Sequence, residues 1–227
     1  MMCIRRPNRV AFIYLKQKKK KGGGDVIFNS YQGPAVPSPV ALVQTRSRRN
    51  SYCRKMGEAV ANVARRINAT VEEGKDSLDL SDCKLISFPD GVFRVLRSVA
   101  ENIRIITLAD NEMKALSSKF FSTFTQLREL NLKGNVLTKL PDAVGEMEHL
   151  TSINLANNSF STFPAKLTEI ATLEKIDLEE NSITEIPLEK LSAMPSLKWV
   201  NVKSNPLNSN TLSALESPHK FDILSTA

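Results

Sequence analysis

Cysteine and histidine are scarce in this chain of 227 residues. The three cysteines, Cys3, Cys53 and Cys83, are odd in number and lack paired spacing, which argues against a disulfide framework and favours a reducing compartment. The two histidines, His149 and His219, form no H-x-x-x-H motif, and no C-x-x-C pair is present. The sequence therefore predicts a protein that is not an enzyme, with no catalytic residue, no metal site and no cofactor.

Long apolar runs are also missing. Apolar residues make up 41 % of the chain, enough for a packed core, but no segment approaches the ~18 consecutive apolar residues of a membrane span. The apolar stretch Val10–Leu15 is too short for a signal peptide, and a lysine run follows it. We therefore expect a soluble, cytoplasmic protein without a membrane span.

Acidic residues are nearly absent from the first 54 positions. Residues 1–54 contain 12 Lys/Arg and only Asp25 as an acid, a net charge of +11, whereas residues 55–227 have a net charge of −4. The stretches KQKKKKGGG, GPAVPSPV and RSRRN offer too little apolar surface to fold, which predicts a basic disordered tail over 1–54. Two interpretations stay open. In the first, the tail serves nuclear import or binds an anionic surface. In the second, it is a solvated arm without a role, or it lies upstream of the true start at Met56.

One short pattern recurs along residues 76–208. LRELNLKGNVLTKLP begins at Leu127, and LTSINLANNSFSTFP begins 23 residues later at Leu150. Six such lines align on one polar position, with spacings of 28, 24, 23, 23 and 24 residues, at Cys83, Asn111, Asn135, Asn158, Asn181 and Asn205. The lines match L-x-x-L-x-L-x-x-N-x-L, the leucine-rich repeat pattern. They predict an α/β solenoid with parallel strands on its concave face and helices or 3₁₀ turns on its convex face.

The spacing inside each line has a physical reason. Counted from the polar residue as position 0, apolar residues at −5 and −3 have the period of two that turns both side chains to one face of a strand. A buried amide after the strand can bond unpaired backbone groups of its own turn and of the neighbouring turn. We therefore expect the six aligned residues to form a structural ladder, with Cys83 as a weaker donor at its end.

Both ends of a solenoid must be covered. Residues 55–75 predict an N-terminal capping helix that ends at Gly74. The apolar residues along one face of this helix are Val60, Val63, Ala64, Ile67 and Val71. After Asn205 the pattern ends, so residues 209–227 are predicted to form a C-terminal cap. The residues expected to cover the last repeat are Leu212, Leu215, Phe221 and Leu224.

Strand positions −6, −4 and −2 are not needed in the core and should face solvent on the concave side. The candidate partner-binding residues there are Asp79, Thr107, Asn131, Lys133, Asn154, Asp177, Glu179, Trp199, Asn201 and Lys203. Trp199 has two interpretations, an aromatic anchor for a partner or a side chain packed under the C-terminal cap. The acidic group of Asp177, Glu179 and Glu180 is interpreted as a solvated patch rather than a catalytic carboxylate site.

Three segments carry a closer resemblance. They are KMGEAVANVARRINATVEEGKDSLDLSDCKLISFP, LRELNLKGNVLTKLP and IDLEENSITEIPLEKLSAMPSLKWVNVKSNPLN. These segments resemble the leucine-rich repeat-containing protein 20 family, within the short intracellular class of such repeats. The resemblance covers about residues 55–224 and implies a small cytosolic protein with no assigned enzyme activity. Residues 1–54 depart from it, because chains of the family begin close to the position of Met56.

Together these features predict a non-enzymatic protein–protein interaction module, an adaptor or regulator that binds a protein partner on its concave face. The alternative is a nucleic-acid or chromatin-associated protein that acts through the basic N-terminal tail. The expected location is cytoplasmic, or nuclear if the tail directs import.

Overall fold

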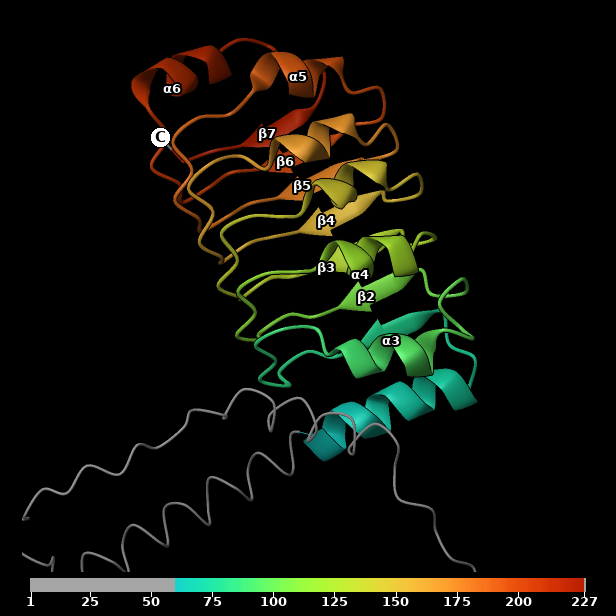
Figure 1. Ribbon diagram of the computed structural model, residues 1–227. Helices are drawn as coiled ribbons and strands as arrows, with labels where there is room; N and C mark the ends of the chain where they lie inside the picture. Colours follow the sequence, from blue (N-terminus) through green and yellow to red (C-terminus); the bar gives the residue numbers. More distant parts are fainter. Residues whose placement is uncertain (1–59, 227) are drawn as a thin grey trace, which may run out of the picture. The chain divides into compact units, whose positions relative to one another are not determined.

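The computed structural model describes residues 60–226 (Figure 1). The predicted tail, the first five residues of the predicted capping helix and Ala227 lie outside the described residues. The chain divides into two compact units, residues 1–65 and 66–227, and all of the repeats belong to the second.

Seven short strands stack in chain order into one parallel sheet (Figure 1). The strands are β1 (Ser77–Asp79), β2 (Ile105–Thr107), β3 (Glu129–Asn131), β4 (Ser152–Asn154), β5 (Lys175–Asp177), β6 (Trp199–Asn201) and β7 (Asp222–Leu224). Each strand pairs residue for residue with the next, so equivalent repeat positions are neighbours across the sheet. The structure confirms the leucine-rich repeat solenoid predicted from the pattern.

The apolar core lies directly behind this sheet. The middle residue of each of the first six strands is at most 2 % exposed, as are the residues at −3. Burying one such aliphatic side chain stabilises the fold by ~1.5–3 kcal/mol. Because the flanking strand residues point the other way, positions −6 and −4 are left on the opposite face, which we call the concave face.

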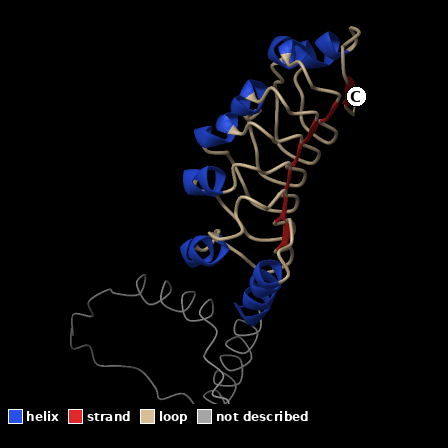
Figure 2. Ribbon diagram, turned by 90° about the vertical axis from the view of Figure 1, so that its right-hand side faces the viewer, coloured by secondary structure: helices blue, strands red, loops and turns tan. Residues whose placement is uncertain are grey.

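Helices and 3₁₀ turns lie on the side opposite the strands (Figure 2). They are α3 (Asp90–Leu96), α4 (Ser118–Thr123), η1 (Asp142–Glu146), η2 (Ala165–Glu169), α5 (Leu188–Ala193) and α6 (Ser209–Leu215). The two 23-residue spacings contain the 3₁₀ turns, whereas the longer spacings before Asn111, Asn135 and Asn205 contain α-helices. A 3₁₀ turn rises about 2.0 Å per residue against about 1.5 Å in an α-helix, so a shorter segment can cross the same repeat.

The C-terminal segment differs from its prediction. The sequence pattern stops at Asn205, yet the chain adds α6 and then β7, which pairs with β6. Phe221 is buried, whereas Leu224 aligns with Asn201 on the solvent side and is 36 % exposed. The expectation that Leu224 covers the last repeat is therefore wrong, because strand alternation turns it outward.

Residues 60–72 are helical, and Gly74 follows with a φ of +62°. The Lys75 N–H donates to the Thr70 carbonyl at 3.1 Å, the long backbone bond of a glycine-terminated helix end. Thr70 Oγ1 in turn donates to the Ser77 carbonyl at 3.3 Å, and Arg66 donates to the Asp79 carbonyl at 3.3 Å. Side chains of this helix thus satisfy carbonyl groups of β1, the first strand of the sheet.

A left-handed residue stands at position −1 in all six repeats. These residues are Asp82, Asp110, Gly134, Asn157, Glu180 and Ser204, with φ between 47° and 68°. The turn directs the chain from the strand to the ladder residue. Only Gly134 adopts this conformation without the steric cost that a Cβ brings. The repeat pattern does not reveal that position −1 needs a positive φ.

Gly134→Ala is expected to destabilise the domain by about 1–2 kcal/mol, because φ stays positive and the new Cβ would overlap the Asp110 carboxylate. Urea denaturation measures the loss. The matched control is the same substitution in an Asp110→Ala background, where the overlap is removed and the loss should be smaller. An equal loss in both backgrounds would show that the Asp110 contact has no effect.

Candidate partner-binding face

The ladder residues bind the backbone of two repeats at once. Asn111 Oδ1 accepts from the N–H groups of Cys83 and Leu85 at 3.0 and 2.9 Å. Its Nδ2 donates to the carbonyls of Leu80 and Leu108 at 2.9 Å each. At the other four asparagines the Oδ1 accepts from one backbone N–H group, and the Nδ2 likewise donates to carbonyls of two repeats; these residues are Asn135, Asn158, Asn181 and Asn205. These bonds hold the sheet that presents the concave face.

Cys83 occupies the first rung of the ladder. Its Sγ donates to the Ser81 carbonyl at 3.3 Å. The cysteine side chain is shorter than the asparagine side chain at the other rungs. Burial raises the pKa of the Cys83 thiol above its ordinary value, which disfavours the reactive thiolate. Cys83 is therefore a packed, weakly bonded end of the ladder.

The ten predicted partner-binding residues all lie on the concave side, at position −6, −4 or −2. Asp79 and Lys133 are exposed, whereas Asn201 is buried. Seven are half-buried, namely Thr107, Asn131, Asn154, Asp177, Glu179, Trp199 and Lys203. Position −6 also brings Glu129 and Lys175 to this face, and both are exposed. The structure therefore aligns the residues but does not expose them equally.

Position −4 has a structural task that the sequence pattern does not reveal. Its side-chain Oδ1 accepts from the backbone N–H two residues later, at 2.9–3.2 Å, in Asp79, Asn131, Asn154, Asp177 and Asn201. Short Asp and Asn side chains favour this local bond, which explains why they hold five of the six −4 positions, with Thr107 in the sixth. A partner would therefore meet more freely variable chemistry at positions −6 and −2.

Three polar side chains meet near the C-terminal end of the concave face. Asn201 Nδ2 donates to Asp177 Oδ1 at 3.1 Å and to Glu179 Oε2 at 3.2 Å. Burial, together with the nearby charge of Glu179, raises the pKa of Asp177 above its ordinary value. The ionised form of Asp177 is thus less favourable in the fold than in the unfolded chain.

Asp177→Asn is expected to stabilise the domain at neutral pH, since the amide keeps an acceptor for the Glu179 N–H and removes the unfavourable charge. Because the folded-state pKa of Asp177 is raised, the native chain binds more protons than the unfolded chain as pH rises from the ordinary pKa of an aspartate through the raised one. Its stability should therefore fall as pH rises through that range. The comparison is urea denaturation of both proteins between acidic and neutral pH. A variant that is less stable at every pH would contradict this assignment.

Asp79 shows the opposite behaviour at the other end of the face. Partial burial acts to raise the pKa of Asp79, but hydrogen bonds from Ser81 and the Arg66 guanidinium outweigh it and lower the pKa. The Arg66–Asp79 distance is 3.2 Å. The ionised form of Asp79 therefore stabilises the fold. This stabilisation is present above the ordinary pKa of an aspartate, and it is lost as pH falls through the lowered pKa of Asp79.

Trp199 lies at position −6 of β6 and is half-buried. Its aligned neighbours are Lys175 on β5 and Asp222 on β7. Val200, the next residue, is fully buried in the core, so alternation places Trp199 on the concave side. Neighbouring strands therefore flank the indole, and part of it stays open to solvent.

The histidines lie away from this face. His149 is exposed in the turn after η1, and His219 stacks on Phe221 with ring centroids 5.6 Å apart. The His219 Nε2 is buried and has no hydrogen-bond partner among residues 60–226. Within the same residues, no three His, Cys, Asp or Glu side chains gather as a potential metal site. No helix of this described part is long and apolar enough to cross a membrane.

Two surface hollows, of about 330 and 380 Å³, lie outside the concave face. Their lining residues come from the segments that lead into η1, η2, α5 and α6, and none occupies position −6, −4 or −2. The concave face itself presents a surface of side chains aligned from strand to strand.

Comparisons with known proteins agree with this architecture. The sequence profile described as Leucine rich repeat matches residues 101–160 and 149–207. The solved leucine-rich repeat domain of the type III effector XCV3220 (XopL) is similar in fold, with a TM-score of 0.58 and 20 % identity. That likeness covers 86 % of this chain and 72 % of the effector chain.

Two curated relatives are much more similar in sequence. The mouse protein named leucine-rich repeat-containing protein 20 is 62 % identical over 171 residues, which is 75 % of this chain and 93 % of the relative. The human protein of the same name is 59 % identical over 171 residues, with the same coverage. Identity at this level over nearly the whole length of both relatives, on a matching repeat architecture, shows that the chain belongs to the leucine-rich repeat-containing protein 20 family.

Proposed function

We propose that the protein is a non-enzymatic interaction module, an adaptor or regulator in the cytoplasm, that binds a protein partner on its concave face. One observation supports this most strongly. The parallel strands pair in strict register, so side chains with no role in the core stand in straight columns on a single face. Neighbouring strands lie about 4.8 Å apart, which gives the columns a fixed spacing.

The residues at positions −6 and −2 are the proposed contacts. Trp199 would act as the anchor, because a half-open indole adds a large contact area with little loss of conformational freedom. Lys133, Lys175 and Lys203 lie on the same face as the acidic pair Asp177 and Glu179. This mixture of charges would select a partner by complementarity rather than by shape alone.

The test uses a double variant, Trp199→Ala with Lys175→Glu. Lys175 is exposed and Trp199 is half-buried, and neither belongs to the buried core, so the fold should be retained, whereas proteins recovered with the tagged full chain should be depleted. Quantitative mass spectrometry of affinity-purified complexes measures the change.

The control variant is Arg97→Glu with Glu148→Lys, two exposed residues in the turns on the helical side. It should retain the recovered proteins. Loss of the same proteins from the control, together with retention by the concave variant, would place the contact on the opposite face and contradict the proposal.

The basic segment 1–54 favours a second candidate function, association with nucleic acid. Such binding should weaken steeply as salt rises and disappear when the chain begins at residue 55. Binding of labelled duplex DNA that survives this truncation would rule out the tail as the contact. The segment lies outside the described residues, so its charge alone supports this candidate.

A further inference from the structure

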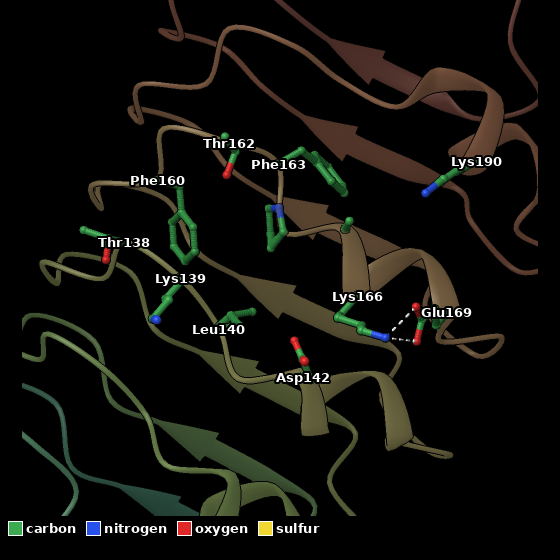
Figure 3. Close-up of a pocket in the computed structure, with 12 residues that line it drawn as sticks. Thr138, Lys139, Leu140, Asp142, Phe160, Thr162, Phe163, Lys166, Glu169 and Lys190 are labelled. Carbon is green, nitrogen blue, oxygen red and sulfur yellow. Dashed lines mark hydrogen bonds and ion pairs between the residues drawn. The ribbon is translucent and has the colours of Figure 1, made fainter.

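A hollow of about 330 Å³ lies between the segments that enter η1 and η2 (Figure 3). Apolar groups contribute to its lining through Leu140, Phe163 and Pro164, and the hydroxyl residues Thr138 and Thr162 add polar groups. This volume falls at the lower end of the range of about 300–1,000 Å³ found for ligand sites. We call this hollow the lateral groove.

Three lysines line the lateral groove, and they differ in their partners. Lys166 Nζ is held by Glu169 through contacts of 2.9 and 3.0 Å, and this ion pair raises the pKa of Lys166. The charge of Asp142 also acts on Lys166. Lys139 and Lys190 lie on opposite sides of the groove in Figure 3, and neither forms an ion pair within residues 60–226. Glu169 is therefore paired with Lys166, and the two lysines without an ion pair remain at the sides of the groove.

The same kind of hollow occurs further along the solenoid. The second one, of about 380 Å³, is lined by Ile186 and Pro187, which occupy in the next repeat the positions that Phe163 and Pro164 hold in theirs. Lys190 lines both hollows. Lys190 therefore lies where an extended ligand would pass from the lateral groove to the second hollow, which α6 also lines.

We propose that the lateral groove binds an extended segment of a partner protein in which apolar side chains are flanked by carboxylates. The apolar lining of the groove accepts the central side chains, and the uncommitted ammonium groups of Lys139 and Lys190 complement an acid on each side. A basic segment would meet two unpaired cations, which disfavours it. None of these residues belongs to the concave face, so this second contact is independent of the proposed function.

The probe is a fluorescein-labelled octapeptide with two glutamates on each side of a Gly-Leu-Phe-Gly centre, titrated against the full chain. Lys139→Glu with Lys190→Glu should weaken its binding about tenfold or more, through lost attraction and new repulsion. Thr162→Trp, at an exposed position in the lining, should block the groove without disturbing the core. The matched control, Lys84→Glu with Lys114→Glu, changes two exposed lysines outside the groove and should leave binding unchanged.

A second peptide, with alanine in place of leucine and phenylalanine, has the same charge and reveals any binding that depends on charge alone. It should bind about tenfold more weakly, because burial of two large apolar side chains is lost. A benzophenone analogue at the phenylalanine position should cross-link to residues 138–166. Equal binding of both peptides, or cross-links only to residues 1–54, would overturn the proposal. Binding that is lost in the Trp199→Ala, Lys175→Glu variant would assign the peptide to the concave face instead, and would overturn it as well.

Discussion

Asn135→Ala is expected to lower the free energy of unfolding by about 2–3 kcal/mol, because buried backbone groups of two repeats lose their partner. Asn135 Oδ1 accepts from the Met113 N–H at 3.0 Å, and its Nδ2 donates to the carbonyls of Leu108 and Leu132 at 3.0 and 2.9 Å. Its side chain lies in the interior, with the residue only 6 % exposed, so water cannot replace these bonds. Urea denaturation followed by circular dichroism measures the loss.

The control for Asn135→Ala is Ser159→Ala, an exposed site directly after a ladder residue. Its effect should stay within about 0.5 kcal/mol. If Asn135→Ala unfolded at the same urea concentration as the unaltered protein, the ladder would have no measurable part in stability.

Ile67→Asp is expected to destabilise the domain by more than about 3 kcal/mol, because it places a carboxylate at a site without compensating partners. Ile67 is 0 % exposed and lies on the helix over residues 60–72. Arg66 and Thr70 of the same helix bond to the edge of β1. Displacing the helix would expose this edge and the core behind it, so soluble monomer should be lost to aggregation.

Size-exclusion chromatography and thermal unfolding measure that outcome. Glu72→Ala, at an exposed position of the same helix, should behave like the unaltered protein. A monomeric Ile67→Asp protein with an unchanged melting temperature would remove the proposal that this helix caps the solenoid.

The repeat core was predictable because its signal is periodic. Leucine, isoleucine or valine occupies −5 and −3 in every line, and only a short strand turns both inward. The segment after Asn205 lacks this signal, so the sequence does not predict β7, although this strand continues the sheet. The left-handed residues at −1 were hidden for another reason. Gly134, Glu180 and Ser204 share a backbone conformation but no side-chain chemistry.

The concave face was predictable in position but not in detail. Strand alternation alone placed Lys133 and Trp199 outside the core. The bonds of Asn201 with Asp177 and Glu179 depend on which residues neighbouring strands bring together, and a single line of the repeat does not contain that information. The lateral groove could not be predicted from the sequence for the same reason, since Lys139, Lys166 and Lys190 come from three different repeats.

Cross-linking mass spectrometry of the affinity-purified complex tests most directly the claim that the concave face binds the partner. A lysine-reactive reagent distinguishes the faces, since Lys133, Lys175 and Lys203 lie on the concave side whereas Lys84 and Lys114 lie outside it. The account predicts partner cross-links from the three concave lysines, and their loss in the Trp199→Ala, Lys175→Glu variant. Cross-links confined to Lys84 and Lys114, unchanged in that variant, would contradict it.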